Sequence, residues 1–230
     1  MEGINMNKLV RSLAWIAAGA AAGVACARLT KKKRDEAPAP QALRHSGTRT
    51  IETKRLILRR FKAEDAGVVY ENWASDPEVT KFLTWQPHVS PEATAEVLED
   101  WEGRYENGAY YHWAIVLKEL GEPIGSISVV DQNDTLKKAH IGYCIGRRWW
   151  HQGIMTEALS AVIQYLFSEG YQRIDSRHDP NNPHSGDVMK KCGMKYEGTL
   201  RNYDWNNQGY CDACFYSILA EEYKEGGRSL

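Results

Sequence analysis

The residues with the clearest chemical signal lie where a strand-like segment gives way to a helix-like one. Residues 141–159 read IGYCIGRRWWHQGIMTEAL, which places Gly153 just before the expected helix. The first N–H groups of a helix have no acceptor within the helix, and the helix dipole adds partial positive charge there. This end of a helix suits a phosphate group, and Arg147 and Arg148 add formal charge nearby. The pattern predicts a phosphate-binding turn, but an ordinary strand–helix turn also fits it.

A second polar segment follows further along the chain. Residues 179–198 read DPNNPHSGDVMKKCGMKYEG, in which Asn182 and Ser185 supply an amide and a hydroxyl group. A hydroxyl can hydrogen-bond a negatively charged leaving group, but Ser is also a common N-cap of helices. We expect a short helix over 185–191, closed by Gly193, so both roles are open to Ser185.

Together, the two segments resemble the acetyl-CoA-binding motifs of the GNAT superfamily, and specifically its RimJ/RimL-type branch. Residues 150–155 occupy the pattern Q/R-x-x-G-x-G/A, and the second segment resembles N-x-x-S…K-x-G-F-x-x-E-G. The resemblance covers residues 48–223. Trp150 replaces the Gln or Arg of the pattern, and Met155 replaces its Gly or Ala. Because the loop would bind through backbone N–H groups, we expect the Met155 side chain to point away from the pyrophosphate.

The resemblance implies an acetyl-CoA-dependent N-acetyltransferase, in which a primary amine of a protein N-terminus or a small molecule attacks the thioester directly. The co-substrate acetyl-CoA would lie between strands over 139–146 and 171–176. Its pantetheine arm would bind like an added strand, and backbone N–H groups would stabilise the developing oxyanion. The family pattern places these residues against the cofactor: Tyr143, Cys144, Ile145, Trp150, His151, Gln152, Gly153, Ile154, Met155 and Asn182.

The leaving thiolate needs a proton or a hydrogen bond. Many superfamily members use a Tyr at the position of Met189, and Met cannot donate. In the RimJ/RimL-type branch the Ser of N-x-x-S takes this role, which makes Ser185 the candidate. His140 is the candidate general base, because the pKa of an imidazole suits proton transfer near neutral pH. A solvated surface position is the alternative for His140 and for the other candidates, which are Asp131, Glu96 and Glu99.

These residues need strands and helices to position them. Alternating and β-branched segments predict strands over 51–61, 110–117, 124–131, 139–146, 171–176, 194–203 and 210–219. Helical spacing and capping residues predict helices over 62–74, 90–105, 153–167 and 185–191. We therefore expect a GNAT-like α/β (α+β) domain with a mixed, mostly antiparallel sheet, a central strand–loop–helix cofactor unit and flanking helices.

Composition narrows the class of protein further. The 230 residues carry 29 Lys and Arg against 30 Asp and Glu, and a net charge of −1 argues against a nucleic-acid surface. The five cysteines, an odd number, argue against a disulfide framework. Cys211 and Cys214 lack further nearby ligands, so no metal site is predicted.

The following aromatic residues could line an acceptor pocket or fill the core: Trp73, Trp85, Trp101, Tyr110, Trp113 and Trp205.

We expect three parts along the chain: an N-terminal segment with a Pro- and Ala-rich linker over 1–47, the acetyltransferase domain over 48–223, and a flexible tail over 224–230. Residues 12–27 form an uncharged apolar run. A membrane anchor, a cleaved signal peptide and a disordered leader all fit this run. The heavier positive charge after it favours an anchor with the catalytic domain in the cytoplasm. A homodimer is a further expectation, and the alternative function is a non-catalytic acyl-CoA sensor or scaffold at a membrane.

Overall fold

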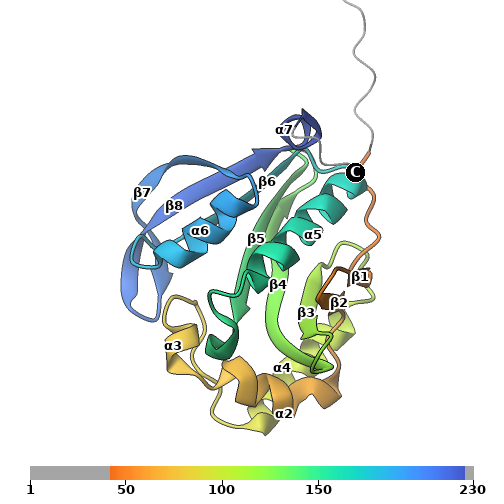
Figure 1. The fold of residues 1–230 in the computed structure, drawn as a ribbon, viewed down its shortest axis with the longest axis vertical. Helices are drawn as coiled ribbons and strands as arrows, with labels where there is room; N and C mark the ends of the chain where they lie inside the picture. Colours follow the sequence, from red (N-terminus) through yellow and green to blue (C-terminus); the bar gives the residue numbers. More distant parts are fainter. Residues whose placement is uncertain (1–41, 226–230) are drawn as a thin grey trace, which may run out of the picture. The chain divides into compact units, whose positions relative to one another are not determined.

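The computed structural model describes residues 42–225, and Figure 1 shows their arrangement. The predicted apolar segment over 12–27 and the end of the predicted tail lie outside these residues. The described strands are β1 (Ile51–Glu52), β2 (Leu56–Arg59), β3 (His112–Leu117), β4 (Glu122–Asn133), β5 (Lys138–Ile145), β6 (Arg173–His178), β7 (Lys195–Asn206) and β8 (Gly209–Leu219).

These strands form one sheet with the order β1-β2-β3-β4-β5-β6-β8-β7. Neighbouring strands are antiparallel except β5 and β6, which run parallel. A parallel pair needs a long crossover connection, and the helix between β5 and β6 provides it. The predicted mixed, mostly antiparallel sheet with one central strand–loop–helix unit is confirmed.

β5 and β6 diverge at the place where the cofactor is expected. Their ladder joins residues 138–140 to residues 173–175 and ends there. Beyond it, β6 stays paired with β8 as far as His178, while β5 stays paired with β4 as far as Ile145. The two strands therefore open a gap in the sheet towards the end of β5.

Helices cover both faces of the sheet. Their bounds are η1 (Ala63–Asp65), α2 (Ala66–Val69), η2 (Tyr70–Ala74), α3 (Pro77–Thr80), α4 (Pro91–Arg104), η3 (Arg147–Trp149), α5 (Ile154–Glu169), α6 (Pro183–Lys191) and α7 (Ala220–Glu225). Buried side chains of α5 and α6 form one core cluster with the sheet, and those of α2, η2 and α4 form another. On β3, Trp113 and Ile115 join the first cluster and Ala114 and Val116 the second, as strand alternation requires.

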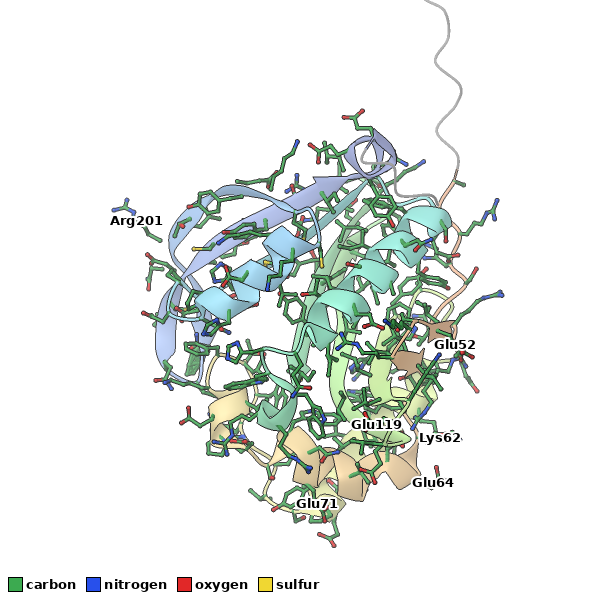
Figure 2. The ribbon with its side chains drawn as sticks, viewed as in Figure 1. Glu52, Lys62, Glu64, Glu71, Glu119 and Arg201 are labelled. Atoms are coloured by element: carbon green, nitrogen blue, oxygen red, sulfur yellow. The ribbon has the colours of Figure 1, made fainter. Side chains whose placement is uncertain are left out.

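Side chains fill the space between the sheet and its helices, while charged groups extend outward (Figure 2). Glu64, Glu71 and Arg201 are among these exposed side chains. Within the described part of the chain, none of the helices combines the length and apolar character needed to cross a bilayer.

Two predicted elements are divided in the structure. The strand expected over 51–61 is split into β1 and β2, because the chain turns sharply at Thr53, whose N–H donates to the carbonyl of Leu56 at 3.0 Å. The helix expected over 62–74 is a 3-10 turn, one α-turn and a π-helical stretch. By contrast, α4 begins as predicted, with the Ser90 hydroxyl accepting from the N–H of Ala93 at 3.2 Å.

The residues just before the predicted domain start also pack on the domain. The N–H of Arg44 donates to the carbonyl of Glu169 at 2.7 Å, and the N–H of Ser46 donates to the Glu169 carboxylate at 2.7 Å. Leu43 packs against the main core. The ordered contacts therefore begin several residues before Thr48, the start expected from composition.

Candidate functional site

A cavity of about 260 Å³ lies at the open end of the gap between β5 and β6. It is lined by the end of β5, the loop before α5, the first turn of α5 and one side of α6, together with residues from 79 to 83. The predicted site residues that line it are Tyr143, Cys144, Ile145, Trp150, His151, Gly153, Ile154, Met155, Asn182 and Ser185. The structure thus gathers both sequence motifs around one space.

The loop over 150–155, here named the cofactor loop, is braced by its own polar groups. The Trp150 indole N–H donates to the carbonyl of Ile145 at 2.8 Å, and the Gln152 amide donates to the carbonyl of Arg148 at 2.8 Å. Gln152 itself does not line the cavity. His151 and Gly153 have positive φ angles of 60° and 71°, which turn the chain into α5. Glycine adopts this conformation without strain, which explains Gly153 at the N-cap of α5.

The first turn of α5 faces the cavity with its backbone. No side chain caps the helix, and the first N–H groups of a helix have no acceptor within it. Ile154, Met155 and Thr156 carry these groups and line the cavity. The helix dipole adds partial positive charge at the same place. This end of α5 can therefore hold a phosphate or pyrophosphate group.

Met155 packs into the main core and is 6% exposed. The Met155 side chain therefore packs among core residues, in keeping with the expectation that it points away from the pyrophosphate. Gly146 allows a further close approach: a Cβ there would lie 2.3 Å from the carbonyl oxygen of Asn72 and 2.7 Å from the Trp149 ring. The π-helical stretch η2 can pack against the end of β5 only because this residue is glycine.

A carboxylate fixes α5 to the turn between β1 and β2. Glu157 accepts hydrogen bonds from the Thr53 hydroxyl at 2.6 Å, the Arg55 N–H at 2.8 Å and the Arg55 Nε at 2.7 Å. Arg55 also donates to the carbonyl of Gln152 at 2.9 Å, which joins the same turn to the cofactor loop. Burial alone would raise the pKa of Glu157, but the bonds from Thr53 and Arg55 outweigh it and hold the pKa below its usual range.

Ser185 and Tyr143 form a pair of hydroxyl groups in the cavity, here named the hydroxyl pair. The Ser185 Oγ donates to the Tyr143 hydroxyl at 3.1 Å, and the Tyr143 hydroxyl donates to the Ser185 carbonyl at 2.9 Å. Burial raises the pKa of Tyr143, against the opposing effect of the Ser185 bond, so the phenol is neutral at physiological pH. By rotating away from Tyr143, the Ser185 hydroxyl can donate a hydrogen bond to a developing anion.

The predicted short helix starts earlier than its Ser suggested. α6 begins at Pro183, with Asn182 in the N-cap position, so Ser185 does not cap the helix. Proline is well suited to the first helical position because its missing N–H needs no partner there. These two extra residues place Ser185 inside the helix, where its hydroxyl bonds to Tyr143 on β5.

Cys144 also lines the cavity but is a neutral thiol. Burial raises its pKa to about 12, so a thiolate does not form at neutral pH. Thiolates, not thiols, are the nucleophiles of cysteine chemistry. Cys144 packs against the second core cluster, so its part in the site is to shape the wall.

His140 does not line the cavity. It is buried in β5 with both ring nitrogens occupied: Nδ1 bonds to the Asp175 carboxylate, and Nε2 lies 3.0 Å from the Arg177 guanidinium. This geometry does not support the prediction that His140 is the general base. Asp131, Glu96 and Glu99 are exposed and also lie outside the cavity lining.

Sequence reasoning missed one wall of the cavity. Val79, Phe82 and Leu83 come from the region of α3, far away in the sequence, and carry no motif. His184 was also missed, and its ring lies 4.6 Å from that of His151. The other lining residues without a predicted role are Trp149, Thr156, Asp187, Val188 and Lys191. None of the aromatic residues proposed for an acceptor pocket lines it; Trp73 and Trp113 are core residues.

Comparisons with known proteins agree with this geometry. The family model described as "Acetyltransferase (GNAT) domain" matches residues 55–195. The uncharacterized N-acetyltransferase p20 of Bacillus licheniformis is 32% identical, over 76% of this chain and 98% of its own length. The [ribosomal protein uS5]-alanine N-acetyltransferase of Escherichia coli (strain K12) is 26% identical, over 66% of this chain and 81% of its own length. A GNAT-family acetyltransferase structure from Bacillus anthracis has a TM-score of 0.65 at 26% identity, covering 76% of this chain and 100% of that one.

These findings confirm the predicted acetyl-CoA-dependent N-acetyltransferase, with acetyl-CoA as co-substrate, and the resemblance to RimJ/RimL-type enzymes. They give no support to a non-catalytic sensor or scaffold. Among residues 42–225, no group of three or more His, Cys, Asp or Glu side chains could hold a metal ion. The uncapped N-terminus of α5, the gap between β5 and β6 and the matching family model lead to one conclusion: the chain belongs to the GNAT acetyltransferase family.

Proposed function

We propose that the cavity holds the acetyl end of acetyl-CoA and that the acceptor is a primary amine, either the N-terminus of a protein or a small free amine. One observation carries this proposal: the N-terminus of α5 and the hydroxyl pair line the same cavity. The Escherichia coli relative is named for acting on an alanine of a ribosomal protein, which supports a protein N-terminus as the first acceptor to test.

The cofactor would lie along the end of β5. The pyrophosphate would sit against the backbone N–H groups of residues 153–156, where the dipole of α5 favours negative charge. The pantetheine arm would follow backbone groups of Tyr143, Cys144 and Ile145, beyond the point where β6 has left β5. Asn182, at the start of α6, would bond a pantetheine amide. This arrangement would bring the thioester close to the hydroxyl pair.

The reaction would be a direct transfer. The amine nitrogen attacks the thioester carbonyl carbon with its lone pair, the C–S bond breaks, and CoA leaves as a thiolate. The Ser185 hydroxyl would turn its proton from the Tyr143 oxygen and donate a hydrogen bond to this thiolate, while the Tyr143 phenol still donates to the Ser185 carbonyl and holds this residue in place. The attacking nitrogen loses one proton to water, so the products are the N-acetylated amine, the CoA thiolate and a released proton.

This function is tested with the full chain, acetyl-CoA, a peptide with a free N-terminal alanine and a panel of small primary amines. CoA release is followed with a thiol reagent, and the acetylated product is identified by mass spectrometry. We expect one class of amine to be acetylated, and the same peptide with a blocked N-terminus to be inert. CoA release without any acetylated amine would contradict the proposal.

We also propose that the domain acts in the cytoplasm. The cysteines of the described residues are free, which suits a reducing compartment. A membrane contact through residues 12–27 and a homodimer are further predictions. Fractionation of cells that express the full chain would test the first, and analytical ultracentrifugation would test the second.

A further inference from the structure

The tip of the β7–β8 hairpin reaches the unpredicted wall of the cavity. This wall is made by residues 79–86, here named the wall loop, of which Val79, Phe82 and Leu83 line the cavity. Figure 1 shows the tip of the hairpin beside α3, whose last two residues begin the wall loop. Asn207, at the tip, makes hydrogen bonds to this loop with its backbone and with both ends of its side-chain amide.

The bonds of Asn207 close the wall loop on itself. The Asn207 Nδ2 donates to the carbonyl of Thr80 at 2.9 Å and to that of Trp85 at 2.8 Å, so one amide group joins the two ends of the loop. The Asn207 N–H donates to the carbonyl of Leu83 at 3.1 Å. The Gln86 amide donates to the Asn207 Oδ1 at 2.6 Å. Residues 81–90 form no helix or strand, so these bonds replace a regular ladder.

The preceding residue, Asn206, connects the same hairpin tip to the opposite side of the cavity. Asn206 is 3% exposed, and its Nδ2 donates to the Asp179 carboxylate at 2.8 Å. Asp179 lies in the turn that leads into α6, where it accepts from the N–H of Asn181 at 2.8 Å and, through its carbonyl, from the N–H of Asn182 at 2.8 Å. Asn182 lines the cavity.

Two consecutive residues of the hairpin tip are therefore hydrogen-bonded to opposite walls of the cavity, Asn207 to the wall loop and Asn206 to the turn before α6. We propose that Asn206 and Asn207 act as a clasp that fixes the separation of the two walls and so positions the acceptor amine. This inference rests on the proposed function. Neither Asn206 nor Asn207 lines the cavity, and the bonds of the clasp do not reach the cofactor loop. Asn207 is therefore a positioning residue and not a catalytic one.

The Asn207 half of the clasp acts on the acceptor more than on the cofactor because of where the wall loop lies, whereas the Asn206 half leads to Asn182, the proposed partner of the pantetheine arm. Phosphate binding uses the backbone of α5, and the hydroxyl pair joins β5 to α6. Neither depends on Phe82 or Leu83, which lie on the wall that the clasp holds. Releasing the wall loop from Asn207 would leave the N-terminus of α5 and the Asn206 bond to Asp179 unchanged, so acetyl-CoA would keep these anchors while the amine lost its confinement. Holding a reactant in a reactive geometry contributes strongly to rate.

The test compares Asn207→Ala and Asn207→Asp with Gln208→Ala in the full chain. Asn207→Asp keeps the size of the side chain and an acceptor for Gln86 but loses both Nδ2 donor bonds. Gln208 is an exposed neighbour in the same turn, so its variant controls for any change at the hairpin tip. The acceptor probe is the peptide with an N-terminal alanine, or the amine of the panel that the wild-type chain acetylates fastest.

We expect KM for the amine to rise about tenfold in both Asn207 variants, while Kd for acetyl-CoA changes by less than about twofold. Amide hydrogen exchange of residues 81–86 should become at least about tenfold faster, with Gln208→Ala like wild type in every measurement.

Wild-type exchange rates in the Asn207 variants would overturn the clasp. An equal rise in KM and Kd would overturn its selectivity for the acceptor. If the wild-type chain acetylates no amine, the proposed function fails with the acceptor part of this inference, and hydrogen exchange still decides whether the clasp holds the loop.

Discussion

Ser185 and Tyr143 bring two hydroxyl groups from different elements into contact inside the cavity. Only Ser185 belongs to the motif that pointed to a proton donor, and its partner Tyr143 was expected to contribute backbone groups alone. The phenol nevertheless fixes both the backbone and the hydroxyl of Ser185. Because the Ser185 proton points at the Tyr143 oxygen, this hydroxyl must rotate before it can donate to the thiolate, while its backbone stays fixed by the phenol.

Ser185→Ala removes the proposed thiolate donor while leaving the cavity wall in place. We expect kcat to fall about 100-fold and Kd for acetyl-CoA to change by less than about twofold, because the hydroxyl acts on the leaving group and not on the bound cofactor. Steady-state kinetics with calorimetric binding provides the measurement. An unchanged kcat would remove Ser185 from the mechanism.

Tyr143→Phe tests whether the phenol acts through Ser185. The ring packs as before, but the Ser185 Oγ and carbonyl lose their partner. We expect a smaller loss of kcat, about tenfold, and no further loss when Tyr143→Phe is added to Ser185→Ala. If the two losses multiply in the double variant, Tyr143 has a role of its own.

At the scale of elements, α5 is held at the cofactor end by Glu157, which joins it to the turn between β1 and β2. Arg55 extends this contact to the carbonyl of Gln152 in the cofactor loop. The same turn splits the predicted first strand, so a departure from the expected strand creates a contact that supports the site.

Glu157→Gln keeps the size of this side chain and removes its charge. We expect the free energy of unfolding at pH 7 to fall by about 1 kcal/mol, since the pair with Arg55 is partly exposed to water. The pKa of Glu157 is lower in the folded state, so its contribution is present above the unfolded pKa and is lost as pH falls through the folded value. Urea unfolding should therefore show that wild type and variant converge in acid. A constant difference at all pH values would contradict this.

The sequence allows the N-terminus of α5, the strands on either side and α4 to be predicted, because each depends on local periodicity or on residues that begin a helix. The wall loop could not be predicted. Asn207 lies 127 residues from Thr80 and 122 from Trp85, and asparagine in a hairpin turn has an ordinary local explanation. His140 was predicted to be the general base from its residue type alone. Only the structure shows that Asp175 and Arg177 contact its two ring nitrogens.

At the scale of the whole molecule, a buried histidine makes folding depend on pH. His112 lies in the core with its ring nitrogens bonded to the Tyr110 hydroxyl at 2.9 Å and the Ser126 hydroxyl at 2.7 Å. Burial, aided by the charge of Arg104, lowers the pKa of His112 to about 3. The folded state therefore keeps a neutral ring at pH values where the unfolded chain binds a proton.

The stability from His112 is complete above the unfolded pKa and is lost as pH falls from about 6.5 toward 3, at about 1.4 kcal/mol per pH unit. His112→Gln keeps polar groups for Tyr110 and Ser126 but cannot titrate. We expect the variant to be less stable at pH 7 and to lose about 2 kcal/mol less than wild type between pH 7 and pH 5. The measurement is urea unfolding of both proteins at pH 7 and pH 5. If wild type and variant lost the same free energy of unfolding between these pH values, His112 would not titrate on unfolding.

The central claim is that acetyl-CoA binds at the N-terminus of α5, and calorimetric titration of acetyl-CoA into the full chain tests it most directly. Gly153→Asp would place a carboxylate where the pyrophosphate is expected. Gly121→Asp is the matched control, because Gly121 has a similar φ of +73°, lies in the turn between β3 and β4 and would have no atom within 4 Å of an added Cβ. We predict micromolar binding by wild type and Gly121→Asp and none by a folded Gly153→Asp. Wild-type affinity in Gly153→Asp, or no binding by the folded wild-type chain, would contradict the claim.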